Sequence, residues 1–517
     1  MKIDQSKLPK HQRISTTIDV EYKNVCDLFF QKSKKNPHKK FLFCPGKNEK
    51  SYTYIELEQK ILSTAKYLEK NGFKKGDRIN LVVPNSAEFV ILYFAGLLLG
   101  MVIVPINEDL SPVEMLYVIN DSKSKAVFYD PAYKHKLDEI EVPSAISIEK
   151  IKDLPSQNPG KIEETTIYDD AIIIYTSGTT GNPKGVVLTH LNLLADAKAV
   201  SEWFELTENS RTLCILPMFH NNGQVMTLLN PLYAGGSTVI VKGKASLMSF
   251  WGLIEKYLIN WTSVMPSILS ILLSLKKERT DNSFEGIFCG GQILTKSVQE
   301  EFESRFGVPI FEGFGLTETT SFACFNDYPA KHRKIGSIGR PLSANEMTIM
   351  DENDKELKPF EEGEICIRGL NVAKEYLGLP DKNMVAFRDG WFHSGDYGYK
   401  DERNYFYFKT RKDFLIIKGG ENIYPAELEN VLFRHPSVAE SAVIGIPDDL
   451  LGEEICAFVA LNDKIEITVE ELKEFCKGKI ANFKQAKEII IIEEIPKGPT
   501  KKVLYRKLKE YYLNSHK

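Results

Sequence analysis

The chain has 517 residues, of which 43% are hydrophobic and 26% charged, and this balance excludes a disordered or fibrous protein. Its 66 Lys and Arg residues nearly offset its 70 Asp and Glu residues, leaving a net charge of −4. Nucleic-acid-binding domains are usually basic, so no nucleic-acid partner is expected. A chain of this length holds about two to four domains.

The cysteine spacing and the N-terminal sequence bear on the compartment. Eight cysteines occur without CxxC spacing, so neither a zinc knuckle nor a disulfide framework is predicted. The N-terminal segment lacks the apolar core of a signal peptide. We therefore expect a protein of the reducing cytoplasm.

One segment resembles a membrane span. Residues 89–106 carry no charge and are about as long as the shortest membrane helix. Glycines at 96 and 100 and a proline at 105 interrupt the run. These interruptions favour a buried helix ending near Gly100 and a buried strand ending at Pro105, and no integral membrane segment is expected.

Strand-like and helical patterns alternate along most of the chain, which predicts α/β layers. Near residue 365 the pattern changes to short strands, as in GEICIRG and ESAVIGIP, and helices are predicted near 425–435 and 469–482. A smaller α+β unit is therefore expected at the C-terminus. The charged stretch Arg411-Lys412-Asp413 suits an exposed boundary, so the predicted domains are 1–412 and 413–517.

Residues 176–185 form a glycine-rich loop, TSGTTGNPKG, directly after the apolar, β-branched run Ala171–Tyr175. That run predicts a buried strand. Glycines let backbone N–H groups turn toward an anion, while hydroxyls and a lysine add donors and positive charge. The pattern predicts a polyphosphate site, or alternatively an ordinary turn between strand and helix. It differs from a Walker A loop because Pro183 stands where that motif needs glycine.

With this loop the chain resembles the adenylate-forming enzymes, which include acyl-CoA synthetases, aryl-CoA ligases, peptide-synthetase adenylation domains and beetle luciferases. Further motifs match in the family's order. They are GFGLTET at 313–319, GWFHSGD at 390–396, Arg411-Lys412-Asp413, IKGGENIYPAELE at 416–428 and PKGPTKK at 496–502. The resemblance covers nearly the whole chain.

This resemblance implies a fold and a reaction. The expected fold is α/β, with a large N-terminal domain of two α/β subdomains and a small β-barrel-like part, and a small mobile α+β C-terminal domain. The reaction joins a carboxylic acid to AMP from ATP, releasing pyrophosphate, and a thiol then displaces AMP to give a thioester. Positioning and charge neutralisation are the enzyme's main contributions. The implied cofactors are ATP, Mg²⁺ and coenzyme A, and the implied setting is fatty acid metabolism.

The family's functional residues map onto positions in this chain. Glu318 and Thr176 are the implied Mg²⁺ ligands, although Glu318 could simply be a capping acid. Lys502 is the implied adenylation lysine, with Lys501 as the alternative and a solvated basic tail as a further one. The residues implied to bind nucleotide or CoA are Thr176, Ser177, Gly178, Thr179, Thr180, Gly181, Lys184, Gly291, Gln292, Phe314, Gly315, Thr317, Asp396, Arg411, Lys418, Gly419 and Gly420.

Several of these positions have specific expected roles. Phe314 stacks on adenine, Asp396 accepts from the ribose hydroxyls and Arg411 contacts the ribose from the other side. Gln292 and Ile293 replace the Ala and Pro common in the adenine-side loop. Asp413 is the implied hinge, about which the small domain rotates between the two half-reactions.

The acyl pocket gives the first indication of the acid. Residues 217–223, PMFHNNG, match the segment beside that pocket, with His220 where amino-acid-activating relatives carry an aspartate. A buried ammonium without a counter-charge is costly, so amino-acid activation is rejected. His220 is either a catalytic residue or a core histidine. Gln224 stands where some long-chain ligases have a tryptophan, which favours a short, medium or functionalised acid.

Three functions remain after this comparison. The leading one is an ATP-dependent acid:CoA ligase. The second is an acyl-AMP ligase that loads the phosphopantetheine arm of an acyl carrier protein. The third is a nucleotide-binding homologue without catalysis, against which Glu318, Asp396, Arg411 and Lys502 argue.

Overall fold

The computed structural model describes residues 3–15, 19–47, 49–160, 162–176, 182–275, 277, 279, 283–419, 421–448, 450–462, 467–498 and 503–515. The chain divides into two compact units. Unit 1 comprises 1–348 and 366–393, and unit 2 comprises 349–365 and 394–517. The fold is mixed α/β, with a large N-terminal and a smaller C-terminal part, as expected.

A nine-stranded sheet forms one layer of unit 1. Its neighbouring strands run parallel from β1 through β10, β9, β11 and β12 to β13, with antiparallel strands at both edges. In spatial order the strands are β15 (Arg340–Pro341), β14 (Cys324–Phe325), β13 (Ile310–Phe314), β12 (Gly286–Cys289), β11 (Trp261–Val264), β9 (Arg211–Cys214), β10 (Ser237–Ile240), β1 (Lys40–Cys44) and β2 (Lys50–Thr53).

A seven-stranded sheet forms the second layer of unit 1. Strands β3, β4, β5 and β6 pair in parallel, while β7, β8 and β18 pair antiparallel. The spatial order is β18 (Glu375–Tyr376), β8 (Lys184–Thr189), β7 (Asp170–Thr176), β4 (Val102–Pro105), β3 (Arg78–Val82), β5 (Ala126–Tyr129) and β6 (Ala145–Ser147).

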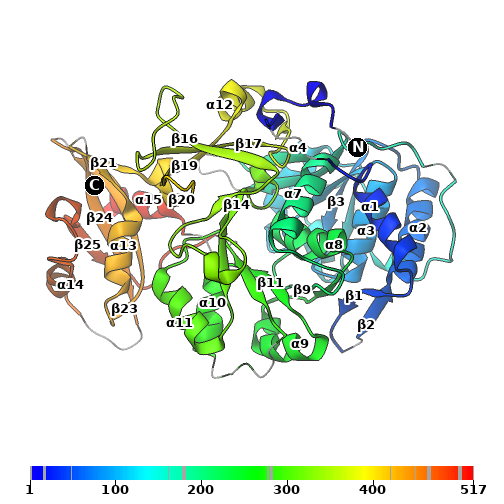
Figure 1. Cartoon of the computed structure of the whole chain (residues 1–517), viewed down its shortest axis with the longest axis horizontal. Coiled ribbons are helices and arrows are strands. Elements are labelled where there is room, and N and C mark those ends of the chain that lie inside the picture. Colours follow the sequence, from blue (N-terminus) through cyan, green and yellow to red (C-terminus); the bar gives the residue numbers. More distant parts are fainter. Residues whose placement is uncertain are drawn as a thin grey trace. The chain divides into compact units, whose positions relative to one another are not determined.

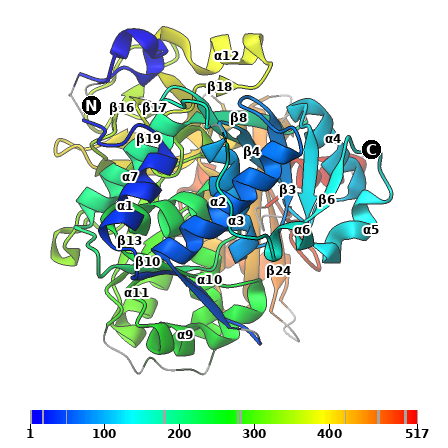
Figure 2. The same ribbon diagram turned by 90° about the vertical axis from the view of Figure 1, so that its right-hand side faces the viewer.

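Helices cover these sheets. The helices α2 and α3 pack on each other in front of β3 and β4 (Figure 2). The helices of unit 1 are α1 (Val25–Lys35), α2 (Tyr54–Lys70), α3 (Ala87–Leu98), α4 (Pro112–Ser122), α5 (Lys134–Leu137), α6 (Glu149–Lys152), α7 (His190–Trp203), α8 (Asn230–Ala234), α9 (Phe250–Tyr257), α10 (Pro266–Ser274), α11 (Lys296–Phe306) and α12 (Pro380–Ala386), together with the π-helix η4 (Asn222–Leu229).

The uncharged segment 89–106 folds as the sequence predicts. Ser86 caps α3 by accepting from the backbone N–H of Phe89 at 3.2 Å, and almost every side chain of the helix is buried. A helix that is apolar all round belongs in a core. Gly100 then adopts a left-handed φ of 69°, which turns the chain into β4. Among the described residues, no helix is long and apolar enough to cross a membrane.

Unit 2 is a smaller α+β unit. Its main sheet runs in the order β22 (Glu421–Ile423), β21 (Ile416–Lys418), β24 (Gly452–Leu461) and β23 (Val438–Asp448), with β25 (Glu488–Ile491) parallel to β24. The helices α13 (Pro425–Phe433) and α14 (Val469–Cys476) both contain residues of this unit's apolar core, and α13 packs on β23 (Figure 1). A final helix is α15 (Tyr505–Ser515).

One helix of unit 2 is shorter than predicted. The sequence predicts a helix to residue 482, but α14 ends at Cys476. Lys477 is extended, and Gly478 has a left-handed φ of 73°. A left-handed glycine is a common end for a helix. The prediction was wrong because the apolar pattern continues past this break.

The remaining strands lie around the division between the units. They form a four-stranded sheet in the order β16 (Asn345–Met350), β17 (Gly363–Gly369), β19 (Phe392–Lys400) and β20 (Phe406–Arg411). The resemblance implies a β-barrel-like part within the N-terminal domain, whereas the strands of this sheet fall in both units. The predicted boundary between residues 412 and 413 lies in the short helix η9 (Lys412–Phe414), between β20 and β21. The assignment of 1–412 and 413–517 as separate domains stays a prediction.

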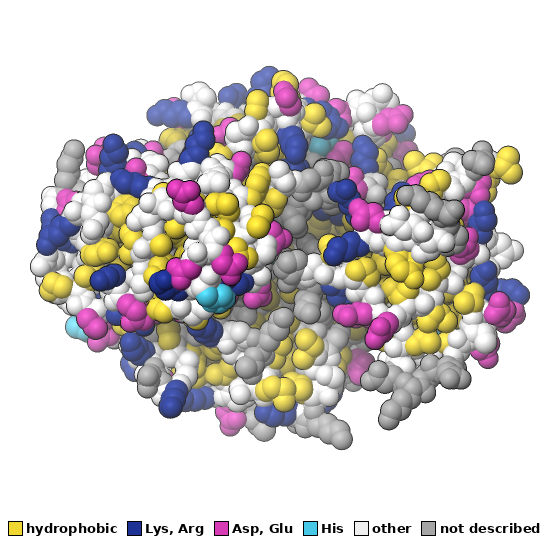
Figure 3. Space-filling model, turned by 180° about the vertical axis from the view of Figure 1, so that it is seen from behind, with side chains coloured by type: hydrophobic (Ala, Val, Ile, Leu, Met, Phe, Trp, Pro, Cys, Tyr) yellow, Lys and Arg dark blue, Asp and Glu magenta, His cyan; other side chains and the backbone are white. Residues whose placement is uncertain are grey.

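The cysteines and the surface charges agree with what the sequence composition predicts. All eight cysteines are free thiols. On the face drawn in Figure 3, side chains of both charges are interspersed, in keeping with the small net charge.

Candidate active site

The predicted phosphate loop connects two antiparallel strands. β7 contains the predicted strand Ala171–Tyr175, and Thr176 at its end pairs with Lys184 at the start of β8. The helix α7 follows β8, capped by Thr189. Ser177, Gly178, Thr179, Thr180 and Gly181 lie outside the described residues. The two flanks therefore fix where the loop begins and ends.

The lysine of this loop faces a tyrosine. The ammonium of Lys184 lies 4.9 Å from the ring centroid of Tyr376, a distance typical of a cation–π contact. Tyr376 is in β18, which pairs with β8. Beside Lys184, Gly185 is required for packing, since a Cβ there would lie 2.9 Å from Ile173. The sheet therefore directs the lysine toward the tyrosine.

The same tyrosine contacts the predicted metal ligand. The hydroxyl of Tyr376 donates to Oε1 of Glu318 at 2.7 Å, and the backbone N–H of Ala373 donates to the carbonyl of Glu318 at 2.7 Å. Glu318 lies in the short helix η6 (Thr317–Thr319), and its side chain is half-buried. The structure thus brings Lys184 and Glu318 together through Tyr376, which the sequence analysis did not single out.

The backbone just after Glu318 is strained. Thr320 is β-branched and has φ 64° and ψ −60°, a region that such residues rarely adopt. Two contacts hold it there. Its hydroxyl donates to the carbonyl of Asn371 at 2.6 Å, and its own carbonyl accepts from the amide of Asn221. Strain of this kind persists only where surrounding structure enforces it, and it is frequent at functional sites.

A buried carboxyl group lies behind this loop. Asp196 of α7 is fully buried, and its Oδ1 accepts from the Asn371 amide at 3.0 Å. The same amide also donates to the carbonyl of Phe322 at 3.1 Å. Burial raises the pKa of Asp196 from 3.8 to about 8. The carboxyl is therefore neutral at moderate pH and forms part of the support of the Glu318 loop.

The raised pKa of Asp196 predicts a pH-dependent stability. Because the pKa of Asp196 is higher in the folded than in the unfolded protein, folding takes up a proton between about pH 4 and about pH 8. The free energy of unfolding therefore declines as the pH rises through this range. Asp196→Asn removes the titrating group. The thermal midpoint of the variant is expected to fall less than that of the unchanged protein between about pH 5 and about pH 8. Equal falls in the two proteins would contradict the neutral carboxyl.

The predicted adenine-side residues follow two neighbouring strands. β12 and β13 are parallel, with Cys289 opposite Glu312, so the loop at Gly290–Gln292 and Phe314 emerge at the same sheet edge. Gly291 has a left-handed φ of 82°. At Gly315 a Cβ would lie 2.0 Å from the Ser321 carbonyl, so only glycine fits. Gln292, Phe314 and Thr317 are half-buried.

In unit 2 the two residues that are predicted to bind the ribose form an ion pair with each other. Asp396 and Arg411 are paired across β19 and β20, and Nε of Arg411 lies 3.2 Å from Oδ1 of Asp396. The side chain of Asp396 is 6% exposed and that of Arg411 39% exposed. The buried carboxylate is therefore paired with the more exposed arginine.

The predicted CoA-side residues of unit 2 lie at the end of β21. Lys418 forms an ion pair with Glu454, and Gly419 has a left-handed φ of 59° with its N–H donating to Leu451 at 2.8 Å. The hinge candidate Asp413 is exposed in η9. Gly420, Lys501 and Lys502 lie outside the described residues.

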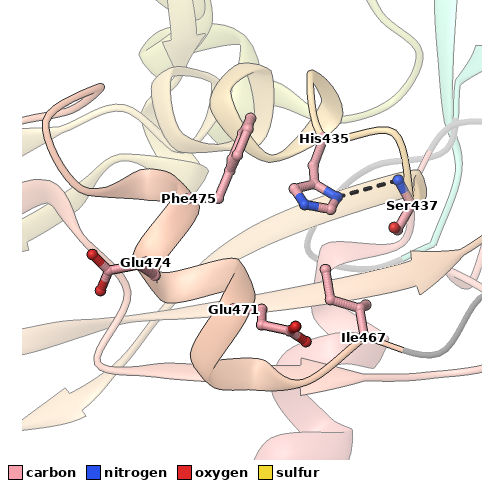
Figure 4. Close-up of a pocket in the computed structure, with 6 residues that line it drawn as sticks. All are labelled: His435, Ser437, Ile467, Glu471, Glu474 and Phe475. Carbon is pink, nitrogen blue, oxygen red and sulfur yellow. Dashed lines mark hydrogen bonds between the residues drawn. The ribbon is translucent and has the colours of Figure 1, made fainter.

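Unit 2 also has a surface hollow that contains none of the predicted residues (Figure 4). Its lining residues are His435, Ser437, Ile467, Glu471, Glu474 and Phe475. The imidazole of His435 accepts from the Ser437 N–H at 3.2 Å, Glu471 completes the capping box of α14, and Glu474 pairs with Lys477. These groups are engaged in local structure of unit 2.

The segment 217–223, which is predicted to lie beside the acyl pocket, follows β9 of the nine-stranded sheet. Phe219 and His220 are half-buried and lie with ring centroids 4.5 Å apart. The π-helix η4 begins two residues later. Gln224 in this helix is fully buried, and its Nε2 donates to the carbonyl of Met218 at 2.7 Å. Its Oε1 has no hydrogen-bond partner among the described residues. π-Helical turns are rare and frequent at functional sites.

Comparisons with known proteins identify the family. The model of the family "AMP-binding enzyme" matches residues 29–377, and that of the "AMP-binding enzyme C-terminal domain" matches 427–502. The oxalate–CoA ligase of Arabidopsis thaliana is 32% identical over 505 residues, covering 93% of this chain and 97% of its own. The sulfoacetate–CoA ligase of Cupriavidus necator is 33% identical over 484 residues, covering 91% and 94%.

A solved structure is equally similar. The o-succinylbenzoate CoA synthetase of Bacillus subtilis in complex with its acyl-adenylate has a TM-score of 0.86 and 31% identity, covering 93% of this chain and 97% of its own. The same enzyme with ATP and a magnesium ion has a TM-score of 0.84 and 30% identity, covering 93% and 99%. The chain belongs to the adenylate-forming AMP-binding enzymes, and it is an ATP-dependent, AMP-forming acid:CoA ligase.

Proposed function

We propose that this ligase activates a small acid that carries a second polar group, with Mg²⁺ and ATP at the Glu318 loop. The observation that carries the proposal is Gln224. Its amide is fully buried beside His220, and Oε1 has no partner among the described residues. A buried unpaired carbonyl is costly. An acid whose far end donates a hydrogen bond, directly or through water, would relieve that cost, whereas a plain alkyl chain would not.

The names of the relatives support this acid class. Oxalate and sulfoacetate are small and carry a second anionic group, and o-succinylbenzoate carries a second carboxylate. Such a group only accepts hydrogen bonds, so it would reach Oε1 of Gln224 through a water molecule, whereas a hydroxyl could donate directly. Asn221 and Asn222 precede Gln224 in the same segment, and Asn221 is buried. A fatty acid with a long alkyl chain is the competing substrate, and fatty acid metabolism would then be the setting.

Magnesium is the expected cation, and Glu318 fits it. Its Oε1 accepts from Tyr376, while no described residue donates a hydrogen bond to its Oε2. A hard cation prefers carboxylate, hydroxyl and phosphate oxygens. Glu318 and Thr176 would hold Mg²⁺, which would neutralise charge on the triphosphate. The chain's own Lys184 supplies a further positive charge near the same tyrosine.

The remaining roles follow the family resemblance. Asp396 and Arg411 bind the ribose, and Lys502 neutralises charge between the acid and the α-phosphate during adenylation. Asp413 is the hinge for residues 413–517, which bring Lys418 and Gly419 toward CoA in the second step. We propose free CoA as the acceptor, in line with the CoA ligases among the relatives, rather than a carrier protein.

A panel of acids tests the substrate class. ATP–pyrophosphate exchange is measured with purified protein, Mg²⁺ and either dicarboxylic, hydroxylated or unsubstituted straight-chain acids. The polar acids are expected to give kcat/KM values about 10-fold or more above alkyl acids of the same length. Exchange that rises steadily with alkyl chain length would contradict the proposal. Omitting Mg²⁺ is expected to abolish exchange with every acid.

A further inference from the structure

We propose that Asn85 is a positioning residue for the acid-side segment 217–220. The proposal rests on the proposed function in one respect, namely that this segment borders the bound acid. Asn85 lies outside every motif that carries the family resemblance, and 133 positions separate it from Met218, its contact in the segment.

The amide of Asn85 uses both its donor and acceptor capacity. Its Nδ2 donates to the carbonyl of Leu216 at 2.9 Å and to that of Val241 at 3.2 Å. Its Oδ1 accepts from the backbone N–H of Met218 at 2.7 Å. An asparagine offers two N–H donors and one carbonyl acceptor, and here they contact three backbone groups, while Sγ of Cys214 also lies 3.7 Å from Nδ2. An aspartate would lack the donors, and an aliphatic side chain would lack both functions.

These contacts join the two sheets of unit 1. Asn85 follows β3 of the seven-stranded sheet. Leu216 follows β9, and Val241 follows β10, which are neighbouring parallel strands of the nine-stranded sheet. The side chain therefore bridges the carboxyl ends of strands from two layers, the edge at which α/β proteins bind ligands.

Met218 is held from two sides. Its N–H donates to Asn85, and its carbonyl accepts from Nε2 of Gln224 at 2.7 Å. The backbone N–H of Gln224 in turn donates to the carbonyl of His220 at 3.3 Å. His220 follows Met218 by two residues, so fixing this peptide fixes where the His220 side chain leaves the backbone. Asn85 and Gln224 thus act on the same turn from opposite ends.

Substitution of Asn85 tests the proposal, because the effect on the KM of the acid can be measured separately from the effect on the KM of ATP. Asn85→Asp and Asn85→Ala are expected to raise the KM of the acid in ATP–pyrophosphate exchange by about 10-fold, the order expected for losing hydrogen bonds to buried carbonyls. The KM of ATP should stay unchanged, because the described nucleotide-side residues do not contact Asn85. The acid used is whichever gives the fastest exchange, so that an error in the proposed acid class does not affect the result.

Ser86→Ala is the matched control. Ser86 is the neighbouring residue and caps α3, so its loss is expected to lower the thermal midpoint, with a cost of about 1 kcal/mol, and to leave the KM of the acid unchanged. If the Asn85 variants behave as Ser86→Ala does, or raise the KM of ATP and acid together, Asn85 is merely structural and the proposal fails.

A double-mutant cycle gives a second, independent readout. If Asn85 and Gln224 act through Met218, the effects of Asn85→Asp and Gln224→Ala on the KM of the acid are expected to be non-additive, the double variant being little worse than the poorer single one. Additive effects would overturn the proposed coupling. Asn85→Asp keeps the shape of the side chain but sets a carboxylate oxygen against the carbonyls of Leu216 and Val241. Asn85→Ser keeps one donor and takes the place of Asn85→Asp or Asn85→Ala in the cycle if either variant loses its cooperative thermal transition.

Discussion

Glu318→Gln is expected to lower the kcat of adenylation by about 10²–10³-fold, the range found when a preorganised charge-stabilising group is removed. The amide is nearly isosteric but neutral, so it neutralises no cation charge and is a poorer ligand for a hard metal. The contacts of the Glu318 backbone with Ala373 remain, and the loop should keep its shape. The measurement is ATP–pyrophosphate exchange over a titration of Mg²⁺.

Tyr376→Phe is the matched control for this prediction. It removes the hydroxyl that donates to Glu318 but keeps the aromatic ring that faces Lys184. Losing one hydrogen bond to a charged group is expected to cost about 10-fold or somewhat more. Higher Mg²⁺ should recover activity in Tyr376→Phe more than in Glu318→Gln. Near-normal exchange in Glu318→Gln would show that the carboxylate is only a capping acid.

A series of contacts supports the Glu318 loop, and it begins at α7, the helix that follows the predicted phosphate loop and β8. Directly after β8, α7 carries Asn192, whose amide donates to the carbonyls of Leu370 and Val372 at 2.7 and 2.8 Å. The next residue along, Ala373, holds the Glu318 carbonyl. Because α7 starts where β8 ends, the predicted phosphate loop and the predicted metal ligand Glu318 are both connected to this helix. Charge stabilisation depends on preorganised groups.

Local patterns in the sequence predicted several elements correctly. The strand at Ala171–Tyr175 and the break at Gly100 follow from apolar runs and from a glycine, and both signals act within a few residues. The predicted helix to residue 482 was wrong for the same kind of reason, since the left-handed Gly478 lies inside an otherwise helical pattern. A glycine ends a helix only where the following chain can turn away, and that depends on tertiary structure.

The support of the site was not predictable from the sequence. Tyr376 contacts Glu318 across 58 positions, and Asn371 contacts Asp196 across 175. Neither pair has a spacing that a helix or strand would produce. The buried Asp196 is likewise indistinguishable in the sequence from an exposed acid. Motifs locate groups that touch the substrates, whereas the residues that orient those groups become visible only when distant segments are brought together.

Lys502→Ala is expected to lower acyl-adenylate formation by about 10²–10³-fold, since a cation placed at charge that develops in the transition state contributes on that scale. The second half-reaction should be largely unaffected, because the resemblance places this lysine at the site only during adenylation. Adenylation is measured by pyrophosphate exchange, and thioester formation is measured separately from supplied acyl-adenylate and CoA.

Lys501→Ala is the matched control, because it removes the same charge one position earlier in the motif PKGPTKK. It is expected to change neither half-reaction appreciably. If Lys501→Ala instead gives the large loss and Lys502→Ala does not, the register of the motif shifts by one residue and Lys501 is the adenylation lysine. If both variants lose a similar small fraction of activity in both half-reactions, the segment is a solvated basic tail. The family's lid lysine would then be missing, and adenylation would have to rely on charges of unit 1 such as Lys184.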